Sequence, residues 1–148
     1  MSVKEKLLIS ACLYGENVKY NGSNNKIKDI DKLKKKYNLI PFCPEVEGGL
    51  PVPRPPSEIV SATPLKIKNI NGIDVSLYFK KGAKKTLQLC EKYGIKKALL
   101  KEKSPSCGKS YIYDGTFSKT LTKGEGVTVS LLIKKKIKIF NENELFEL

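Results

Sequence analysis

Histidine and tryptophan are absent from this chain of 148 residues, and arginine occurs once, at Arg54. The lack of histidine excludes catalytic triads and dyads that need an imidazole base, and it excludes zinc sites built on histidine ligands. No apolar run approaches the roughly 20 residues of a membrane-spanning helix, and the first residues lack the hydrophobic centre of a signal peptide. We therefore expect a cytoplasmic protein with no membrane partner.

The net charge of +13 results from an excess of lysine over acidic residues, since 28 residues are Lys or Arg and 15 are Asp or Glu. Lysine-rich surfaces attract phosphate groups, which makes nucleic acid a possible partner. The lysines are spread along the chain, however, and only Arg54 offers the guanidinium fork that recognises bases and phosphates bidentately. We expect no direct contact with nucleic acid, although a field this positive attracts anionic small molecules.

Strand and helix patterns alternate along the chain, which predicts an α/β fold. Short apolar runs predict strands at residues 7–9, 39–42, 97–100 and 137–140. Apolar residues at three- and four-residue spacing predict helices at residues 27–37, 75–93 and 127–133. This alternation predicts a three-layer domain in which helices cover both faces of a mainly parallel sheet, and the length fits one domain over 1–148.

Two further segments carry turn signals. Residues 65–70 alternate and are followed by Asn71-Gly72, which predicts a small hairpin insertion with the return strand at 73–75. Residues 43–57 are rich in proline and glycine, which predicts a rigid, extended and non-helical segment.

Three of the four cysteines follow predicted strands, each in a loop with Gly or Pro close by: Cys12, Cys43 and Cys107. Ligands bind at the carboxyl ends of the strands in open α/β sheets, so three thiols meeting there have the composition of a soft metal site. A free cysteine is also a common small core residue, and three thiolates with one open position describe a catalytic zinc site as well as an iron–sulfur site. Spacing alone leaves these alternatives open. Cys90 lies on the apolar stripe of the predicted helix 75–93, so we expect it to pack and not to ligate.

Three long segments have unusual sequences: SACLYGENVKYNG from residue 10, CPEVEGGLPVPRPPSE from residue 43 and LLKEKSPSCG from residue 99. In these segments, and in their order and spacing, the chain resembles the thiouracil desulfidase family. The resemblance covers nearly the whole chain and implies a small Rossmann-like domain. It also implies a [4Fe-4S] cluster held by the cysteines that match Cys12, Cys43 and Cys107, with the fourth iron open to the sulfur of a thiolated nucleobase.

The same resemblance makes Glu45 and Ser104 the candidate acid/base residues. It implies non-redox desulfuration of 2- or 4-thiouracil-like bases to the oxo form with release of hydrosulfide, in which the open iron acts as a Lewis acid toward the thiocarbonyl sulfur. Glu45 would activate a water, and Ser104 would help to move a proton to the ring nitrogen. Glu47 and Ser106 are the neighbouring alternatives. Arg54, on a stiff Pro-rich segment, is suited either to clamping a loop or to contacting the substrate.

The alternative function is a non-catalytic iron–sulfur or zinc module that delivers sulfur or metal or senses redox state. An iron-containing brown protein would favour the cluster, and a colourless zinc protein would favour the alternative. For the desulfidase reading we expect a small thiolated nucleobase as partner and a monomer or weak homodimer as the working state.

Overall fold

A computed structural model, which describes residues 4–148, has a four-stranded parallel sheet at its centre with the strand order β2-β1-β5-β8. The strands are β1 (Glu5–Ser10), β2 (Tyr37–Phe42), β5 (Lys97–Leu100) and β8 (Lys138–Asn141). All four strands expected from apolar runs are therefore confirmed. The runs are continuous because helices bury both faces of the sheet, so successive residues such as Leu7 and Leu8 are both inaccessible to water.

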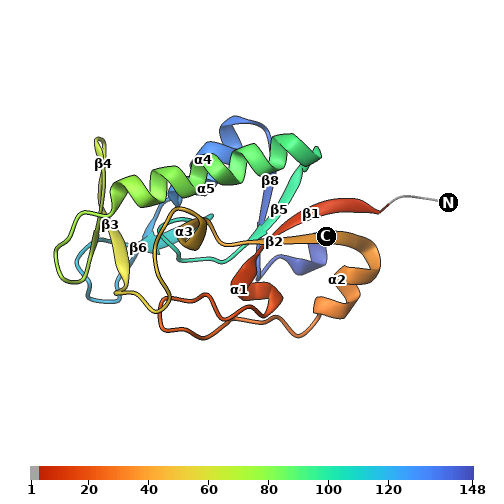
Figure 1. Cartoon of the computed structure of the whole chain (residues 1–148), viewed down its shortest axis with the longest axis horizontal. Helices are drawn as coiled ribbons and strands as arrows, with labels where there is room; N and C mark the ends of the chain where they lie inside the picture. Colours follow the sequence, from red (N-terminus) through yellow and green to blue (C-terminus); the bar gives the residue numbers. More distant parts are fainter. Residues whose placement is uncertain (1–3) are drawn as a thin grey trace.

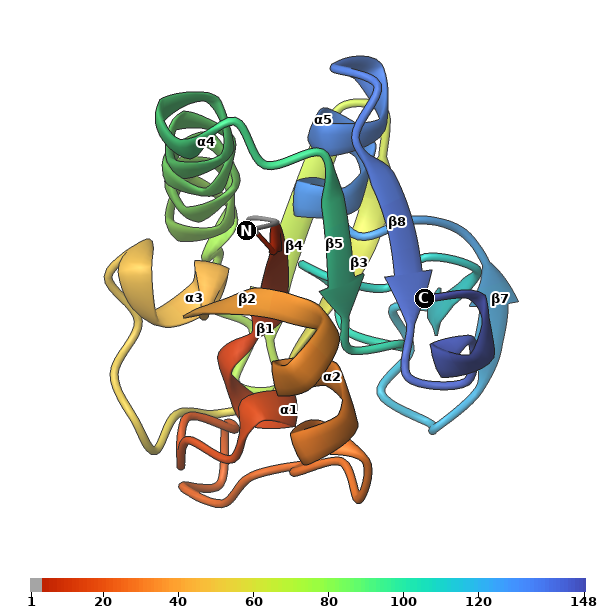
Figure 2. The ribbon, with the colours of Figure 1, turned by 90° about the vertical axis from the view of Figure 1, so that its right-hand side faces the viewer.

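Helices cover both faces of this sheet, which confirms the three-layer α/β architecture (Figure 1). On one face lie α4 (Ser76–Tyr93) and α5 (Val127–Lys134), which pack side by side (Figure 2). The other face is covered by α1 (Ala11–Tyr14), α2 (Ile30–Lys36) and the C-terminal 3-10 turn η1 (Leu145–Glu147). Alternate residues of each strand enter the two cores: Leu8 contacts the α4–α5 side, and Leu7 and Ile9 contact the α1–α2 side.

Two antiparallel ribbons extend the domain beyond the parallel sheet. In the first, β3 (Ser57–Ala62) pairs with β4 (Leu65–Asn69); in the second, β6 (Tyr111–Tyr113) pairs with β7 (Leu121–Lys123). The predicted return of residues 73–75 along β4 is present but is limited to one isolated bridge, Lys68 with Asp74. The longer partner of β4 is β3. The predicted turn itself is present, with Gly72 at a φ of 79°.

Two helix assignments from the sequence need correction. The helix expected over 27–37 is shorter, because α2 ends at Lys36 and the backbone of Tyr37 is already extended where it enters β2. The segment 43–57 was expected to contain no helix, yet α3 (Pro44–Glu47) forms a single turn. Proline is tolerated at the first position of a helix, because its missing N–H has no partner there in any case.

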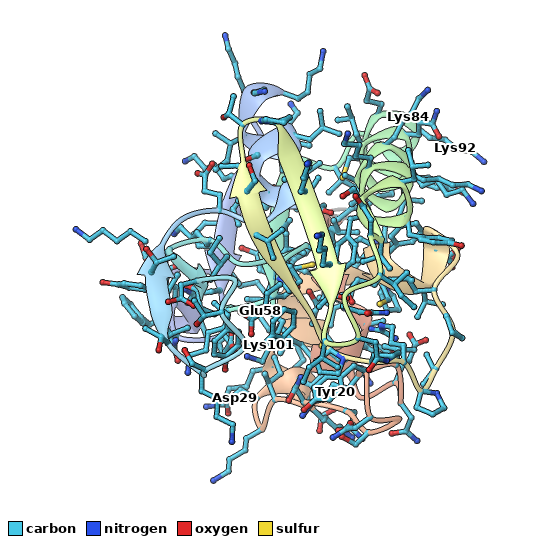
Figure 3. The ribbon with its side chains drawn as sticks, turned by 90° about the vertical axis from the view of Figure 1, so that its left-hand side faces the viewer. Tyr20, Asp29, Glu58, Lys84, Lys92 and Lys101 are labelled. Atoms are coloured by element: carbon cyan, nitrogen blue, oxygen red, sulfur yellow. The ribbon has the colours of Figure 1, made fainter. Side chains whose placement is uncertain are left out.

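The charge of the chain is largely at its surface. Lys84 and Lys92 project from the outer face of α4, away from the sheet (Figure 3). Within residues 4–148, every helix is too short or too polar to cross a membrane.

Candidate functional site

The strand order brings the three predicted loop cysteines to one edge of the sheet. Strand β1 lies between β2 and β5, so the connection from β1 to β2 and the connection from β2 to β5 run on opposite sides of the sheet. This arrangement leaves a crevice at the carboxyl end of β1. Cys12 follows β1 within α1, Cys43 directly follows β2, and Cys107 lies in the loop after β5. All three line one cavity of about 520 Å³, as the sequence led us to expect.

Burial strongly affects the chemistry of these thiols. It raises the pKa of Cys12, although a hydrogen bond with Asn25 and the charge of Lys101 act in the opposite direction. Burial also raises the pKa of Cys43, and it raises the pKa of Cys107 most, with the neighbouring Cys43 adding to the effect. The thiolate forms that bind metals therefore need a cation beside them, since the protein environment alone favours the neutral thiols.

Close backbone packing fixes the position of Cys43. The turn α3, which begins directly after this cysteine, packs against α4. A β-carbon at Gly82 of α4 would collide with the carbonyl oxygen of Pro44. Only glycine allows this approach, so Gly82 determines how closely the Cys43 segment lies to the helix.

The loop of Cys107 is held on its inner side by hydroxyl groups. The Ser104 hydroxyl oxygen accepts hydrogen bonds from the backbone N–H groups of Ser106 and Cys107, each at 3.0 Å. The buried Ser106 hydroxyl lies 2.8 Å from that of Thr128, at the start of α5. Ser106 therefore anchors the loop to α5, whereas Ser104, of these two serines, is the one that lines the cavity.

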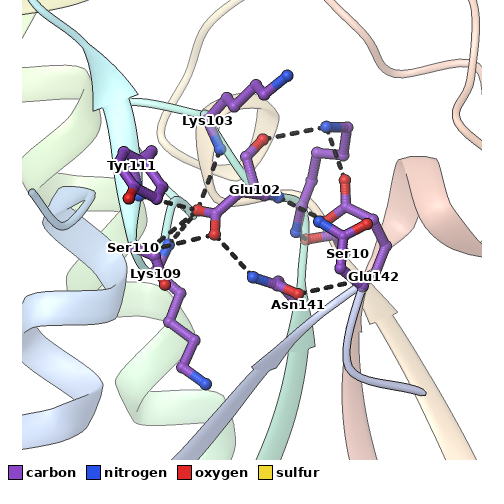
Figure 4. A network of polar contacts seen from close by, with 10 residues as sticks. Ser10, Glu102, Lys103, Lys109, Ser110, Tyr111, Asn141 and Glu142 are labelled. Carbon is purple, nitrogen blue, oxygen red and sulfur yellow. Dashed lines mark hydrogen bonds and ion pairs between the residues drawn. The ribbon is translucent and has the colours of Figure 1, made fainter. Parts of the chain in front are cut away.

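On its outer side, the same loop wraps around the buried carboxylate of Glu102 (Figure 4). This carboxylate accepts backbone N–H groups from Lys109 at 2.7 Å, Ser110 at 3.1 Å and Lys103 at 3.2 Å. The side-chain amide of Asn141, at the end of β8, donates to its second oxygen at 2.7 Å. Burial acts to raise the pKa of Glu102, but these hydrogen bonds outweigh it, so the pKa lies below its usual value.

Glu45 and Ser104, the two candidate acid/base residues, lie together in the cavity. The Ser104 hydroxyl donates to Glu45 Oε2 at 3.4 Å, and Arg54 Nε donates to Glu45 Oε1 at 3.2 Å. The side chain of Arg54 is 5% exposed, and it also donates to the carbonyl oxygens of Pro51 and Val18. Arg54 is therefore a buried clamp between two loops that also fixes the orientation of the Glu45 carboxylate.

The two other residues considered from the sequence lie outside this group. Glu47, the alternative acid, is exposed to solvent at the end of α3. Cys90 is 1% exposed in the core between α4 and the sheet, where burial raises its pKa to about 11. The prediction that Cys90 packs in the core is therefore consistent with its position.

Sequence reasoning missed several residues of the cavity. Lys101, at the end of β5, lines it with an ammonium group that pairs with Glu142 at 2.8 Å. Glu58 and Phe117 line it as well, from β3 and from the loop before β7. Tyr20, Glu58 and Lys101 lie in one region of the molecule (Figure 3). No local signal identifies Glu58, Lys101 or Phe117, because the segments that carry them are far apart in the sequence.

The cavity offers sulfur ligands but does not gather them at a single point. Within the described residues, no three Cys, Asp or Glu side chains come close enough together to hold one metal ion. A single zinc ion needs all its thiolates at about 2.3 Å from one centre, whereas the thiolates of an iron–sulfur cluster bind different irons. Three thiols that line a shared cavity are a donor set that fits an iron–sulfur cluster.

Comparison with known proteins gives concordant matches over nearly the whole chain. A family model described as 2-thiouracil desulfurase matches residues 7–144. The protein YbbK of Bacillus subtilis (strain 168) is 39% identical over 146 residues, which cover 94% of this chain and 97% of that protein. The solved structure of the [4Fe-4S]-dependent thiouracil desulfidase TudS is 44% identical, with a TM-score of 0.92, and the match covers 98% of this chain and 95% of that chain.

Proposed function

The chain belongs to the 2-thiouracil desulfurase family, and from that premise we propose that it is a [4Fe-4S]-dependent enzyme that removes sulfur from thiolated uracil. The main observation in support of this proposal is that one cavity is lined by Cys12, Cys43 and Cys107 together with Glu45 and Ser104. The likeness to the structure of TudS supports the same activity.

Cys12, Cys43 and Cys107 would hold the cluster. Sulfur ligands suit iron–sulfur clusters, and three protein thiolates leave one iron for the substrate. When bound, the cluster supplies a Lewis acid for the thiocarbonyl sulfur, which makes the attached ring carbon more electrophilic.

Glu45 is the proposed base. Its carboxylate takes a proton from a water, whose oxygen adds to the ring carbon that carries the sulfur. The carbon–sulfur bond then breaks, the carbonyl forms, and the sulfur leaves as hydrosulfide. Water and the thiolated base thus give the oxo base and hydrogen sulfide, with no net oxidation or reduction.

Arg54 and Ser104 support this step by holding the two oxygens of Glu45. Arg54 Nε donates to Oε1 and the Ser104 hydroxyl donates to Oε2, so the carboxylate is oriented before the substrate arrives. The Ser104 hydroxyl is itself fixed by two backbone N–H groups of the Cys107 loop. We propose that it passes the proton from Glu45 to the ring nitrogen of the adduct, and that this proton and the proton of the added hydroxyl leave with the sulfur as the carbonyl forms.

We also propose a domain organisation, a cellular location and a working state for the enzyme. The core clusters and the matched region support treating 1–148 as one domain. All four cysteines are free thiols, which is consistent with the reducing cytoplasm. The substrate would be a small-molecule base, handled by a monomer or weak homodimer.

The test is anaerobic reconstitution with iron and sulfide, followed by incubation with 2-thiouracil and 4-thiouracil and measurement of uracil and sulfide. We expect the wild type to release both products in equal amounts. Glu45→Gln should retain the iron but lose turnover, because the amide keeps the size of the side chain and removes the base. Ser104→Ala should lower the rate less, since water partly replaces a hydroxyl. A reconstituted wild type that releases neither product would overturn the proposed function.

A further inference from the structure

Backbone strain is concentrated around the proposed active site. Positive φ angles at non-glycine residues are uncommon, and within residues 4–148 they occur at Lys103, Phe117, Lys119 and Lys136. Three of these four, with φ angles of 71° at Lys103, 58° at Phe117 and 62° at Lys119, line the cavity that holds the three cysteines. A bulky residue in this conformation persists only where its surroundings enforce it.

Glu58 enforces the conformation at Phe117. This carboxylate is 8% exposed, and its Oε1 atom accepts the backbone N–H of Gly115 at 2.9 Å and that of Phe117 at 3.1 Å. The loop is also closed at its base, where the N–H of Asp114 donates to the carbonyl of Thr120 at 2.9 Å. The chain therefore uses a buried charge from β3 to hold one aromatic residue at the cavity wall.

The other aromatic side chains of the cavity are held in different ways. Tyr20 is 44% exposed in the loop after α1, Phe42 packs against the core on the α4–α5 side, and Tyr113 lies within β6, where it pairs with Leu121. Phe117 is half-buried, so one part of its side chain is covered by protein while it still lines the cavity. A flat pyrimidine ring needs a flat apolar surface, and aromatic side chains provide the strongest stacking.

We propose that Phe117 is a specificity-determining residue whose ring stacks on the pyrimidine of the substrate, and that Glu58 is the positioning residue that holds it there. This inference rests on the proposed desulfuration, and it adds the group that recognises the ring. Glu45 and the cysteines that hold the cluster serve the reaction at the sulfur-bearing carbon, whereas Phe117 contacts a face of the ring.

The test compares aromatic and aliphatic residues at position 117 in the reconstituted enzyme. Phe117→Leu keeps apolar bulk and removes the aromatic face, so KM for 2-thiouracil should rise about five-fold or more. The value of kcat and the iron content should stay within about two-fold of the wild type, because stacking contributes to binding and the cluster ligands are untouched. Phe117→Tyr should restore KM. Tyr93→Leu, which removes a similarly exposed aromatic side chain at the end of α4 and outside the cavity, is the matched control and should leave KM nearly unchanged.

Glu58→Met tests the positioning role, because it keeps the length of the side chain and removes both acceptor oxygens. The N–H groups of Gly115 and Phe117 then lose their shared acceptor, so KM should rise in the same direction while kcat and iron content are retained. Glu58→Gln, whose amide oxygen can still accept both N–H groups, is the control and should keep KM closer to that of the wild type. A purely structural role would lower the thermal stability and leave KM unchanged.

The absence of tryptophan allows a readout that does not depend on turnover. Phe117→Trp would introduce the chain's only indole, and added uracil should quench its fluorescence by stacking. Tyr93→Trp, outside the cavity, should show no such quenching. A wild-type KM in Phe117→Leu, or an indole at position 117 that uracil does not affect, would overturn this inference even if the wild type converts 2-thiouracil. A wild type that is reconstituted but inactive would overturn the proposed function instead.

Discussion

Replacing Glu102 by glutamine should destabilise the iron-free protein by about 3 kcal/mol at pH 7. The side chain keeps its size, but the ionised carboxylate is lost and one oxygen becomes an amide NH₂. That NH₂ group would face either the Asn141 amide or the loop N–H groups, all of which are donors in the native structure (Figure 4).

The magnitude follows from these contacts. Hydrogen bonds to a charged acceptor contribute about 1.5–3 kcal/mol each and neutral ones about 1 kcal/mol, so the three short backbone contacts each lose a fraction of their strength. The donor left without an acceptor adds about 1–3 kcal/mol, because it is buried. A flip of the Asn141 side-chain amide cannot compensate, because its oxygen already accepts the N–H of Asn143 at 2.9 Å.

The sign of the pH dependence provides a second check. The pKa of Glu102 is lowered in the folded protein, so its contribution is complete above the unfolded value of 4.5 and is lost as the pH falls through the folded value. The difference in stability between wild type and Glu102→Gln should therefore shrink on acidification below about pH 4. Protonation gives the wild type the same neutral side chain that the variant always has.

Urea denaturation of the iron-free proteins measures these differences without the binding energy of the cofactor. Glu125→Gln is the control, because Glu125 is exposed and contacts only the Ser130 hydroxyl; we expect a change within about 0.5 kcal/mol. A loss below about 1 kcal/mol for Glu102→Gln at pH 7, or one that is constant with pH, would refute the reasoning.

Three further substitutions test the assignments of the site. Cys90→Ala should keep the full iron content after reconstitution and lower the free energy of unfolding by about 1 kcal/mol, whereas Cys107→Ala should lose stable iron binding; the reverse result in an iron assay would refute the ligand set. Arg54→Lys should lower kcat and destabilise the protein by about 2 kcal/mol, because an ammonium cannot reach Glu45 and the two loop carbonyls together. Wild-type kinetics in that variant would show that the guanidinium does not orient Glu45.

The sheet and the cysteine loops could be predicted because their signals are local. The run Leu7-Leu8-Ile9 specifies a buried strand without reference to the rest of the chain. A parallel sheet then places the carboxyl ends of its strands at one edge, so Cys12, Cys43 and Cys107 converge as a consequence of topology.

The parts that could not be predicted depend on contacts between distant segments. Glu58 holds Phe117, 59 residues away, and Glu102 binds Asn141, 39 residues away. Neither partner carries a motif, since a buried carboxylate has the same residue type as an exposed one. The turn α3 was missed for a different reason, because a proline-rich composition describes a whole segment and cannot locate one helical turn at Pro44.

Contacts between protein groups hold the three segments that carry the thiols. Cys12 lies in the turn that continues β1, Cys43 is fixed by the close approach of Pro44 to Gly82, and Cys107 lies in a loop anchored by Glu102. These are contacts between protein groups, so we expect the fold to survive loss of the cluster. Iron without a protein ligand is the most accessible to oxidants. Air exposure should therefore abolish desulfidase activity with little change in the far-UV circular dichroism, and anaerobic iron, sulfide and thiol should restore it.

Activity that survives complete removal of iron by chelation would contradict the cluster mechanism. Loss of the helical signal together with the iron would contradict the claim that the fold holds the thiols in place.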